Sequence, residues 1–236
     1  MAQIFSFPGR ASARREHPPA RPDGVPDTVW HAVQSVFAMP TVPGVQFHEV
    51  PVPKSIADYG IGVGMVRADD ATQSDDWSAL WHVYSCAHPS GIQGGNAIGS
   101  GDMHKIVGEA AWGWIMLLYY ADPPQEWESR WRCVAFCRIP GQPDTHDDDG
   151  HYNTAACWHA VNSGLHKTGV DTDTISGTIT VSHDTFFGRQ ANDNMPARCE
   201  LRVSWTPPAR DLDTPDSIDA GMQVAQWAEL VAHGIG

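Results

Sequence analysis

Basic residues are scarce in this sequence. The chain has 15 lysines and arginines against 28 aspartates and glutamates, which gives a formal net charge of -13. Binding to a nucleic-acid backbone needs cations gathered against the phosphates, and no cluster of lysines and arginines is visible between residues 27 and 236. The charge therefore disfavours nucleic-acid binding, although a fold can bring scattered arginines together on one face.

Long apolar runs and a dense cysteine framework are also missing. The longest apolar run, Trp112 to Ala121, is far shorter than the ~20 residues that a membrane-spanning helix needs. The N-terminal sequence MAQIFSFPGRASARREHPPARP has no apolar segment of the signal-peptide kind. The five cysteines are odd in number and widely spaced. Together these absences predict a reduced, cytoplasmic protein with no membrane span.

Familiar catalytic motifs are absent as well. There is no Gly-x-Ser-x-Gly element, and the glycines between Gly91 and Gly101 are not followed by Gly-Lys-Ser/Thr. Ser182, His183 and Asp184 are consecutive, so their side chains would point in different directions on a strand and do not form a triad by adjacency. The sequence therefore contains no recognisable motif for nucleophilic catalysis. It favours a protein that is not an enzyme and holds no cofactor.

The distribution of apolar residues predicts one domain of the α+β class. Residues 1 to 26 are typical of a disordered tail, and residues 27 to 236 form a single domain with a loop-rich insertion at 68 to 108. Strands come in runs, which predicts a mostly antiparallel sheet of about five strands with three helices. The expected order is helix, three strands, helix, two strands, helix. By topology alone, this order resembles secretion-chaperone-like proteins.

Residue periodicity places these elements along the chain. Helical spacing and capping residues predict helices that begin at Asp27, at Tyr152, and at Asp213 or Thr214 with Pro215 in the first turn. Apolar runs and alternation predict strands at 59–66, 111–120, 131–139, 174–183 and 198–205. Prolines make the segment 45–52 at best an edge strand. The alternating glycines Gly60, Gly62 and Gly64 indicate close backbone packing.

A set of short motifs in this order resembles a known family. The motifs are Glu49-Val50-Pro51-Val52-Pro53 with Ala57 and Tyr59, Ser176-Gly177-Thr178-Ile179-Thr180, Phe187-Gly188, Leu201-Arg202-Val203-Ser204-Trp205-Thr206-Pro207, and Trp227. As a set they resemble the actinobacterial domain of unknown function 3000 family over roughly residues 27 to 234, with the insertion at 68 to 108 as a departure. The resemblance implies a cytoplasmic protein with no established activity, and it supplies no catalytic residues.

The sharpest candidate for chemistry is the segment His146-Asp147-Asp148-Asp149-Gly150-His151. Mixed imidazole and carboxylate ligands suit zinc, manganese or iron, so His146, Asp147, Asp149 and His151 form a candidate metal site. The spacing matches no standard motif. The simpler interpretation is a solvated acidic loop whose carboxylates complement the N-terminus of the following helix. Both interpretations stay open at this point.

Cys133 and Cys137 lie on one face of a predicted strand. Four residues of strand place them ~13 Å apart, which is too far for a disulfide. The sequence therefore predicts that they are small buried hydrophobic residues.

Three tryptophans lie outside the predicted core. Trp77, Trp81 and Trp127 stand beside acidic residues in the insertion and in a hairpin turn, which suits a partner surface; a small local cluster is the alternative. The leading hypothesis is a non-enzymatic adaptor or chaperone-like module that presents a groove or a sheet edge to another protein. A metal-dependent protein is the first alternative. RNA association is the second, and it requires four arginines to share one sheet face: Arg132, Arg138, Arg198 and Arg202.

Overall fold

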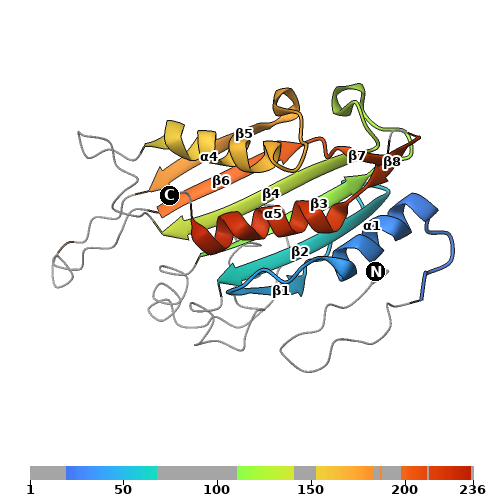
Figure 1. Ribbon diagram of the computed structural model, residues 1–236, viewed down its shortest axis with the longest axis horizontal. Helices are drawn as coiled ribbons and strands as arrows, with labels where there is room; N and C mark the ends of the chain where they lie inside the picture. The colour runs from blue at the N-terminus through green and yellow to red at the C-terminus, as the bar shows by residue number, and fades with distance from the viewer. Residues whose placement is uncertain are drawn as a thin grey trace.

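Six strands form one antiparallel sheet in the order β1-β2-β3-β4-β6-β5 (Figure 1). The structure is a computed structural model that describes residues 20–67, 111–140, 153–182, 187, 198–211 and 213–234. The strands are β1 (Val45–Glu49), β2 (Tyr59–Arg67), β3 (Trp112–Tyr119), β4 (Trp131–Pro140), β5 (Ser176–Ser182) and β6 (Arg198–Trp205). All neighbouring pairs are antiparallel, which confirms the predicted sheet type. The number exceeds the predicted five because the proline-broken segment pairs with β2 as the edge strand β1.

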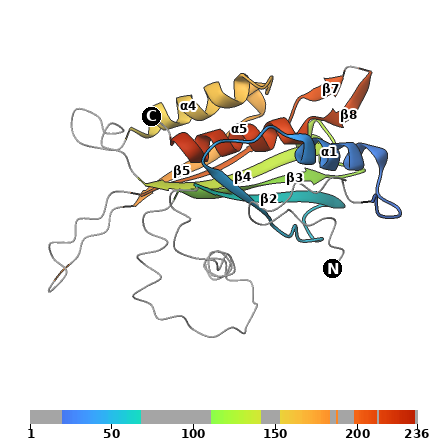
Figure 2. The same ribbon diagram turned by 60° about the horizontal axis from the view of Figure 1, so that its bottom comes forward.

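Three helices of the described ranges lie on the same face of this sheet (Figure 2). The helix α5 (Ala220–His233) runs along the middle of the sheet, α1 (Asp27–Ala38) lies beside it, and α4 (Thr154–His166) lies over β5 and β6 (Figure 1). Two short 3-10 helices, η2 (Gln125–Trp127) and η4 (Thr172–Thr174), and a ribbon of β7 (Ala209–Asp211) and β8 (Thr214–Ile218) complete the described elements. The α+β class with three helices is confirmed, while residues 1 to 19 and the predicted insertion at 68 to 108 lie outside the described ranges.

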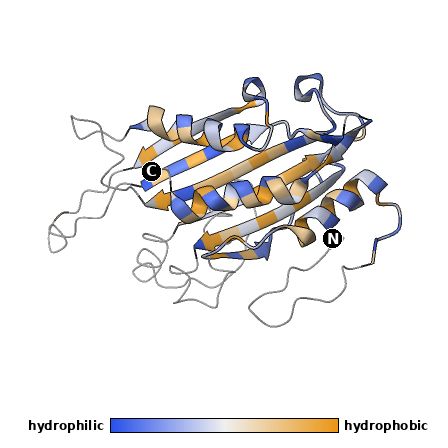
Figure 3. Cartoon of the chain, in the orientation of Figure 1, coloured by the Kyte–Doolittle hydropathy of each residue, from blue (hydrophilic) through white to orange (hydrophobic). Residues whose placement is uncertain are grey.

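Alternation of residue type sorts the strand side chains between the two faces. In β6, hydrophobic and hydrophilic residues alternate along the strand (Figure 3). Its apolar residues Cys199, Leu201, Val203 and Trp205 are buried under the helices. The central strand β3 is buried at all eight positions, as its continuous apolar sequence predicts. Apolar packing therefore occurs on both faces of the centre of the sheet.

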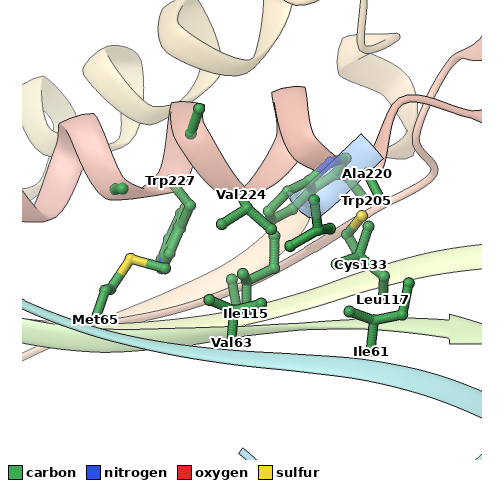
Figure 4. Close-up of a cluster of buried hydrophobic side chains, with 14 of the residues drawn as sticks. Ile61, Val63, Met65, Ile115, Leu117, Cys133, Trp205, Ala220, Val224 and Trp227 are labelled. Atoms are coloured by element: carbon green, nitrogen blue, oxygen red, sulfur yellow. The ribbon is translucent and has the colours of Figure 1, made fainter. Parts of the chain in front are cut away.

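The main core lies between the sheet and α5. Side chains from β2, β3, β4 and β6 meet Val224 and Trp227 of α5 in one cluster (Figure 4). Trp131, Trp205 and Trp227 are fully buried in it. Burying an aromatic side chain of this size contributes about 2–3 kcal/mol relative to exposure. This layer of α5 on the sheet is therefore a large source of stability.

Indole hydrogen bonds fix the position of α5 over the sheet. The Nε1 of Trp227 donates to the carbonyl of Phe136 in β4 at 3.1 Å, and the Nε1 of Trp205 in β6 donates to Oε1 of Gln223 in α5 at 2.7 Å. Gly113 lies beside the same carbonyl, and a Cβ there would overlap with the oxygen of Phe136. Glycine at this position therefore leaves room for the carbonyl that accepts from Trp227.

The predicted start of the last helix is wrong. The helix begins at Ala220, and the carboxylate of Asp219 caps it by accepting from the backbone N–H of Met222 at 3.0 Å. The residues after Asp213, including Pro215, form β8 instead. An ion pair of 2.9 Å between Arg130 and Asp216, and a 2.8 Å bond from the indole of Trp131 to the Asp216 carbonyl, hold this segment extended. Tertiary contacts thus override a local capping pattern.

Candidate functional site

The face of the sheet turned away from the three helices carries glycines, aromatic rings and arginines close together. We call it the second face, and strand alternation and register assign its side chains. They are His48 and Val50 beside Gly60, Gly62, Gly64 and Val66; Trp112, Trp114, Met116 and Leu118; Arg132, Val134, Phe136 and Arg138; Arg198, Glu200, Arg202 and Ser204; and Ser176, Thr178, Thr180 and Ser182.

A stripe of glycines on β2 allows the chain around β1 to lie directly against the sheet. A Cβ on Gly62 would overlap with the carbonyl of Val50, and a Cβ on Gly64 would overlap with the imidazole of His48. The same holds for Gly60 and the side chain of Val52. The predicted close packing of these glycines is therefore confirmed. Burial lowers the pKa of His48 below its ordinary value.

Three aromatic rings form the centre of the second face. The centroid of Phe136 lies 5.1 Å from that of Trp112 and 6.1 Å from that of Trp114. The exposed fractions of Trp112, Trp114 and Phe136 are only 9%, 9% and 4%. The guanidinium of Arg202 lies over the Phe136 ring at 5.4 Å from the centroid, a cation–π distance. The rings are thus packed among themselves and against arginine rather than displayed to solvent.

Arg132 reaches across two strands toward the edge of the sheet. Its guanidinium donates to the hydroxyls of Thr206 at 3.1 Å, Ser204 at 2.9 Å and Ser176 at 3.4 Å. No carboxylate pairs with it within the described part of the chain. Burial lowers the pKa of Arg132. A positive charge therefore lies near the start of β5, and no carboxylate of the described residues neutralises it.

Arg138 and Arg198 provide a second concentration of positive charge at the opposite end of β4. Burial first, and then the nearby charge of Arg198, lower the pKa of Arg138, while Glu200 opposes this. Glu200 itself accepts a hydrogen bond from Arg202 at 3.1 Å. All four arginines that the RNA hypothesis requires on one sheet face do lie on this face.

The strand β5 forms one edge of the sheet. It is seven residues long, SGTITVS, and contains neither a charged residue nor a proline. Its second-face side chains Ser176, Thr178, Thr180 and Ser182 are exposed hydroxyls. The opposite edge, β1, is five residues long, contains His48 and Glu49, and is followed by prolines at 51 and 53. The two edges therefore differ sharply in how well they are protected.

The predicted site residues fall partly within the described structure. Trp127 is half-buried against Tyr120, with ring centroids 5.3 Å apart, and its carbonyl accepts from the hydroxyl of Thr206 at 2.9 Å. Trp77, Trp81 and the metal candidates His146, Asp147, Asp149 and His151 lie outside the described residues. Their roles therefore stay predictions. Among the residues that are described, no group of three or more His, Cys, Asp or Glu could hold a metal ion.

The cysteines behave as small buried residues. Cys133, Cys137, Cys157 and Cys199 are all buried, as predicted for Cys133 and Cys137. Burial raises the pKa of both Cys133 and Cys137, which makes these thiols poor nucleophiles. Over the same described stretches, no helix has the length and apolarity required to cross a membrane.

Sequence reasoning missed the relation between Trp112 and Arg138. The alternation of β4 puts Arg132, Phe136 and Arg138 on one side, but only the register shows that Trp112 faces Arg138 across the strand pair. The β3 sequence does indicate that Trp112 and Trp114 share one face, because they alternate with smaller residues. The pairing depends on strand register, which a hairpin of this loop length does not fix.

Comparisons with known proteins give one result. No curated protein and no solved structure matches the chain, so the topological analogy to secretion chaperones stays a prediction. A family model does match, over residues 25–236. Since that match spans most of the chain, the protein belongs to the family described as "Protein of unknown function (DUF3000)".

Proposed function

We propose that this protein is a non-enzymatic, cytoplasmic interaction module that binds an extended acidic segment of a partner protein along β5. The observation that carries the proposal is the edge strand Ser176–Ser182, which has no charged residue and no proline and has no strand beyond it among the described residues. Natural proteins protect sheet edges with charged residues, prolines or short strands. β1 carries such features and β5 does not.

An edge strand offers hydrogen bonds to an added strand. In an antiparallel sheet, every second residue of an edge strand directs its N–H and C=O outward. A partner segment in extended conformation pairs with these groups, and its alternate side chains then select the partner. The β-branched residues of β5 favour the extended backbone that this pairing needs.

The charge on the second face supports an acidic partner. Arg132 reaches Ser176 on β5, and Arg202 stands on the neighbouring strand β6 with more than half of its side chain exposed. Carboxylates of a strand added beside β5 would meet the hydroxyl row and then these guanidinium groups. Charge-assisted bonds of this kind are roughly twice as strong as neutral ones. The edge provides the backbone contacts and the arginines provide the selectivity.

Hydrogen exchange with a defined probe tests this proposal. The probe is a ten-residue peptide in which glutamate alternates with threonine, and its matched control carries lysine in place of glutamate. We expect the glutamate peptide to slow amide exchange in Ser176–Ser182, and the lysine peptide to have no effect. A glutamate peptide N-methylated at alternate residues loses its donors and should not protect β5. Exchange in β1 serves as the internal reference.

The outcome that contradicts the proposal is equally specific. If the amides of β5 exchange at the same rate with and without the glutamate peptide, edge pairing is excluded for this class of partner. Protection that is as strong with the lysine peptide would keep the edge as the binding element but reject the acidic selectivity.

A second candidate function, RNA association, is favoured by the placement of Arg132, Arg138, Arg198 and Arg202 on one face. Phosphate contacts strengthen steeply as salt falls. Single-stranded oligonucleotides should then bind at low salt, and Arg202→Gln with Arg132→Gln should weaken the binding. No binding at low salt would remove this candidate. The burial of the aromatic rings, which leaves little surface for base stacking, places it second.

A further inference from the structure

The cross-strand pair Trp112 and Arg138 has buried donors without acceptors. The two residues face each other in the register of β3 and β4, on the second face of the sheet. The indole Nε1 of Trp112 and the Nε of Arg138 are both buried, and neither has a hydrogen-bond partner within the described structure. Cross-strand neighbours have Cβ atoms about 4.5–5.5 Å apart. The two orphaned donors thus belong to one small region.

Three buried indoles of the main core do have acceptors. The Nε1 atoms of Trp131, Trp205 and Trp227 donate at 2.8, 2.7 and 3.1 Å. Because a buried donor without an acceptor is costly, native proteins rarely leave one. Trp112 and Arg138 therefore call for an acceptor that these described residues do not supply.

The charge around Arg138 specifies what kind of acceptor fits. The carboxylate that faces Arg138 in the register, Glu200, accepts from Arg202, and no ion pair of Arg138 exists among the described residues. Arg198 is close enough to repel the charge of Arg138. Two like charges near each other favour an anion between or beside them.

We propose that Arg138 and Trp112, with the nearby charge of Arg198, form a binding site for a single oxyanion group, a carboxylate or a phosphate. A guanidinium offers parallel N–H groups that match two oxygens of such a group, and an indole N–H only donates. Arg138 lies six residues along β4 from Arg132, about 20 Å in an extended strand. This site is thus separate from the Arg132 end of β5, and it does not rest on the proposed function.

Indole resonances in 15N–1H spectra of the full chain provide the test. Trp112→Phe keeps an aromatic ring, removes the N–H and so identifies the Trp112 resonance. We expect inorganic phosphate to shift that resonance saturably at low millimolar concentration, while the Trp131, Trp205 and Trp227 resonances stay in place. Sodium chloride at matched ionic strength should not reproduce the shift.

Variants of the arginine show whether the site is specific. Arg138→Gln should weaken phosphate binding at least tenfold, and Arg138→Lys, which keeps the charge but loses the planar fork, should weaken it less. Arg210→Gln, on the exposed strand β7, is the matched control and should bind like the wild type. Should Arg138→Gln fail to fold, Arg138→Lys still provides the comparison, because it keeps the Trp112 resonance that reports binding.

Two anions separate the possible sources of the group. Saturation by phosphate but not by acetate would assign the site to a phosphate, and saturation by both would show that it accepts either group, including a carboxylate side chain of a partner. The proposal is overturned if neither anion shifts the Trp112 resonance saturably, or if Arg138→Gln binds as tightly as the wild type. Protection of β5 by a peptide is measured separately and is not affected by either result.

Discussion

At the scale of single residues, the second face depends on glycines that let neighbouring residues lie directly against the backbone, and not on large side chains alone. Gly64 has space for no side chain because the imidazole of His48 occupies the place of a Cβ. The alternation of glycines was visible in the sequence and predicted close packing. The identity of the covering residue was not visible, since His48 meets Gly64 only through the register of β1 with β2.

A double-mutant cycle tests this contact. Gly64→Ala should lower the free energy of unfolding by about 1–3 kcal/mol, because the new methyl group collides with the imidazole. In a His48→Ala background the same substitution should cost much less, so the two changes should couple by more than about 0.5 kcal/mol. Urea unfolding of the four proteins measures this. Additive effects would contradict the contact.

Burial of His48 also makes stability depend on pH. Burial lowers its pKa below the ordinary value of 6.5. Below pH 6.5 the unfolded chain binds a proton that the folded protein does not bind until the pH reaches the lowered pKa. The free energy of unfolding should therefore fall as pH drops through that window, and should not change through this group at higher pH.

Chemical unfolding between pH 7.5 and 5 measures this slope. His48→Gln should flatten it, whereas His166→Gln, which changes an exposed residue of α4, should leave it as in the wild type. An unchanged slope in His48→Gln would assign the pH dependence to other groups.

At the scale of elements, the sequence predicts existence and type well and boundaries less well. The strands around 59–66, 111–120, 131–139 and 198–205 are found within two residues, because continuous apolar runs and alternation are strong signals. The last helix was placed too early because Asp213, Thr214 and Pro215 form a good local start signal. Asp219 has the same capping chemistry, and only the contacts of Asp216 with Trp131 and Arg130 decide between them.

Two aspartates therefore make a matched pair of variants. Asp219→Ala should lower the free energy of unfolding by about 1 kcal/mol, because it removes the acceptor for the N–H of Met222. Asp213→Ala, at the start that the sequence alone favours, should have little effect since Asp213 is exposed and caps no helix. Thermal unfolding of both variants measures the difference. Equal losses of stability in the two variants would contradict the assignment of Asp219 as the residue that caps α5.

At the scale of the whole molecule, the second face differs in charge from the chain as a whole. The chain carries a formal charge of -13, yet four arginines share the second face. The sequence predicted the total but not this gathering, because Arg132 and Arg138 on β4 and Arg198 and Arg202 on β6 become neighbours only when β6 pairs with β4. The sequence therefore identifies the four arginines that would have to share one face. Only the strand order shows that they do.

The excess acidic charge should make the folded state sensitive to salt. Like charges repel more strongly in a compact chain than in an expanded one. Raising sodium chloride from about 10 mM to about 150 mM shortens the screening length from about 30 Å to about 8 Å, so the melting temperature should rise. Potassium chloride should give the same increase, because screening does not depend on the cation. A lower melting temperature would show that favourable ion pairs outweigh the repulsion.

The position of β6 has a further consequence for how the chain reaches its folded state. On a ribosome, β5 leaves the exit tunnel before β6, yet β6 must enter between β4 and β5. During that interval β5 has no neighbour within the sheet, and β4 is a temporary edge. The helix α5, which covers the centre of the sheet, is made after all six of these strands. We therefore expect folding to wait until nearly the whole polypeptide has been synthesised, and nascent chains that lack α5 to be substrates for chaperones.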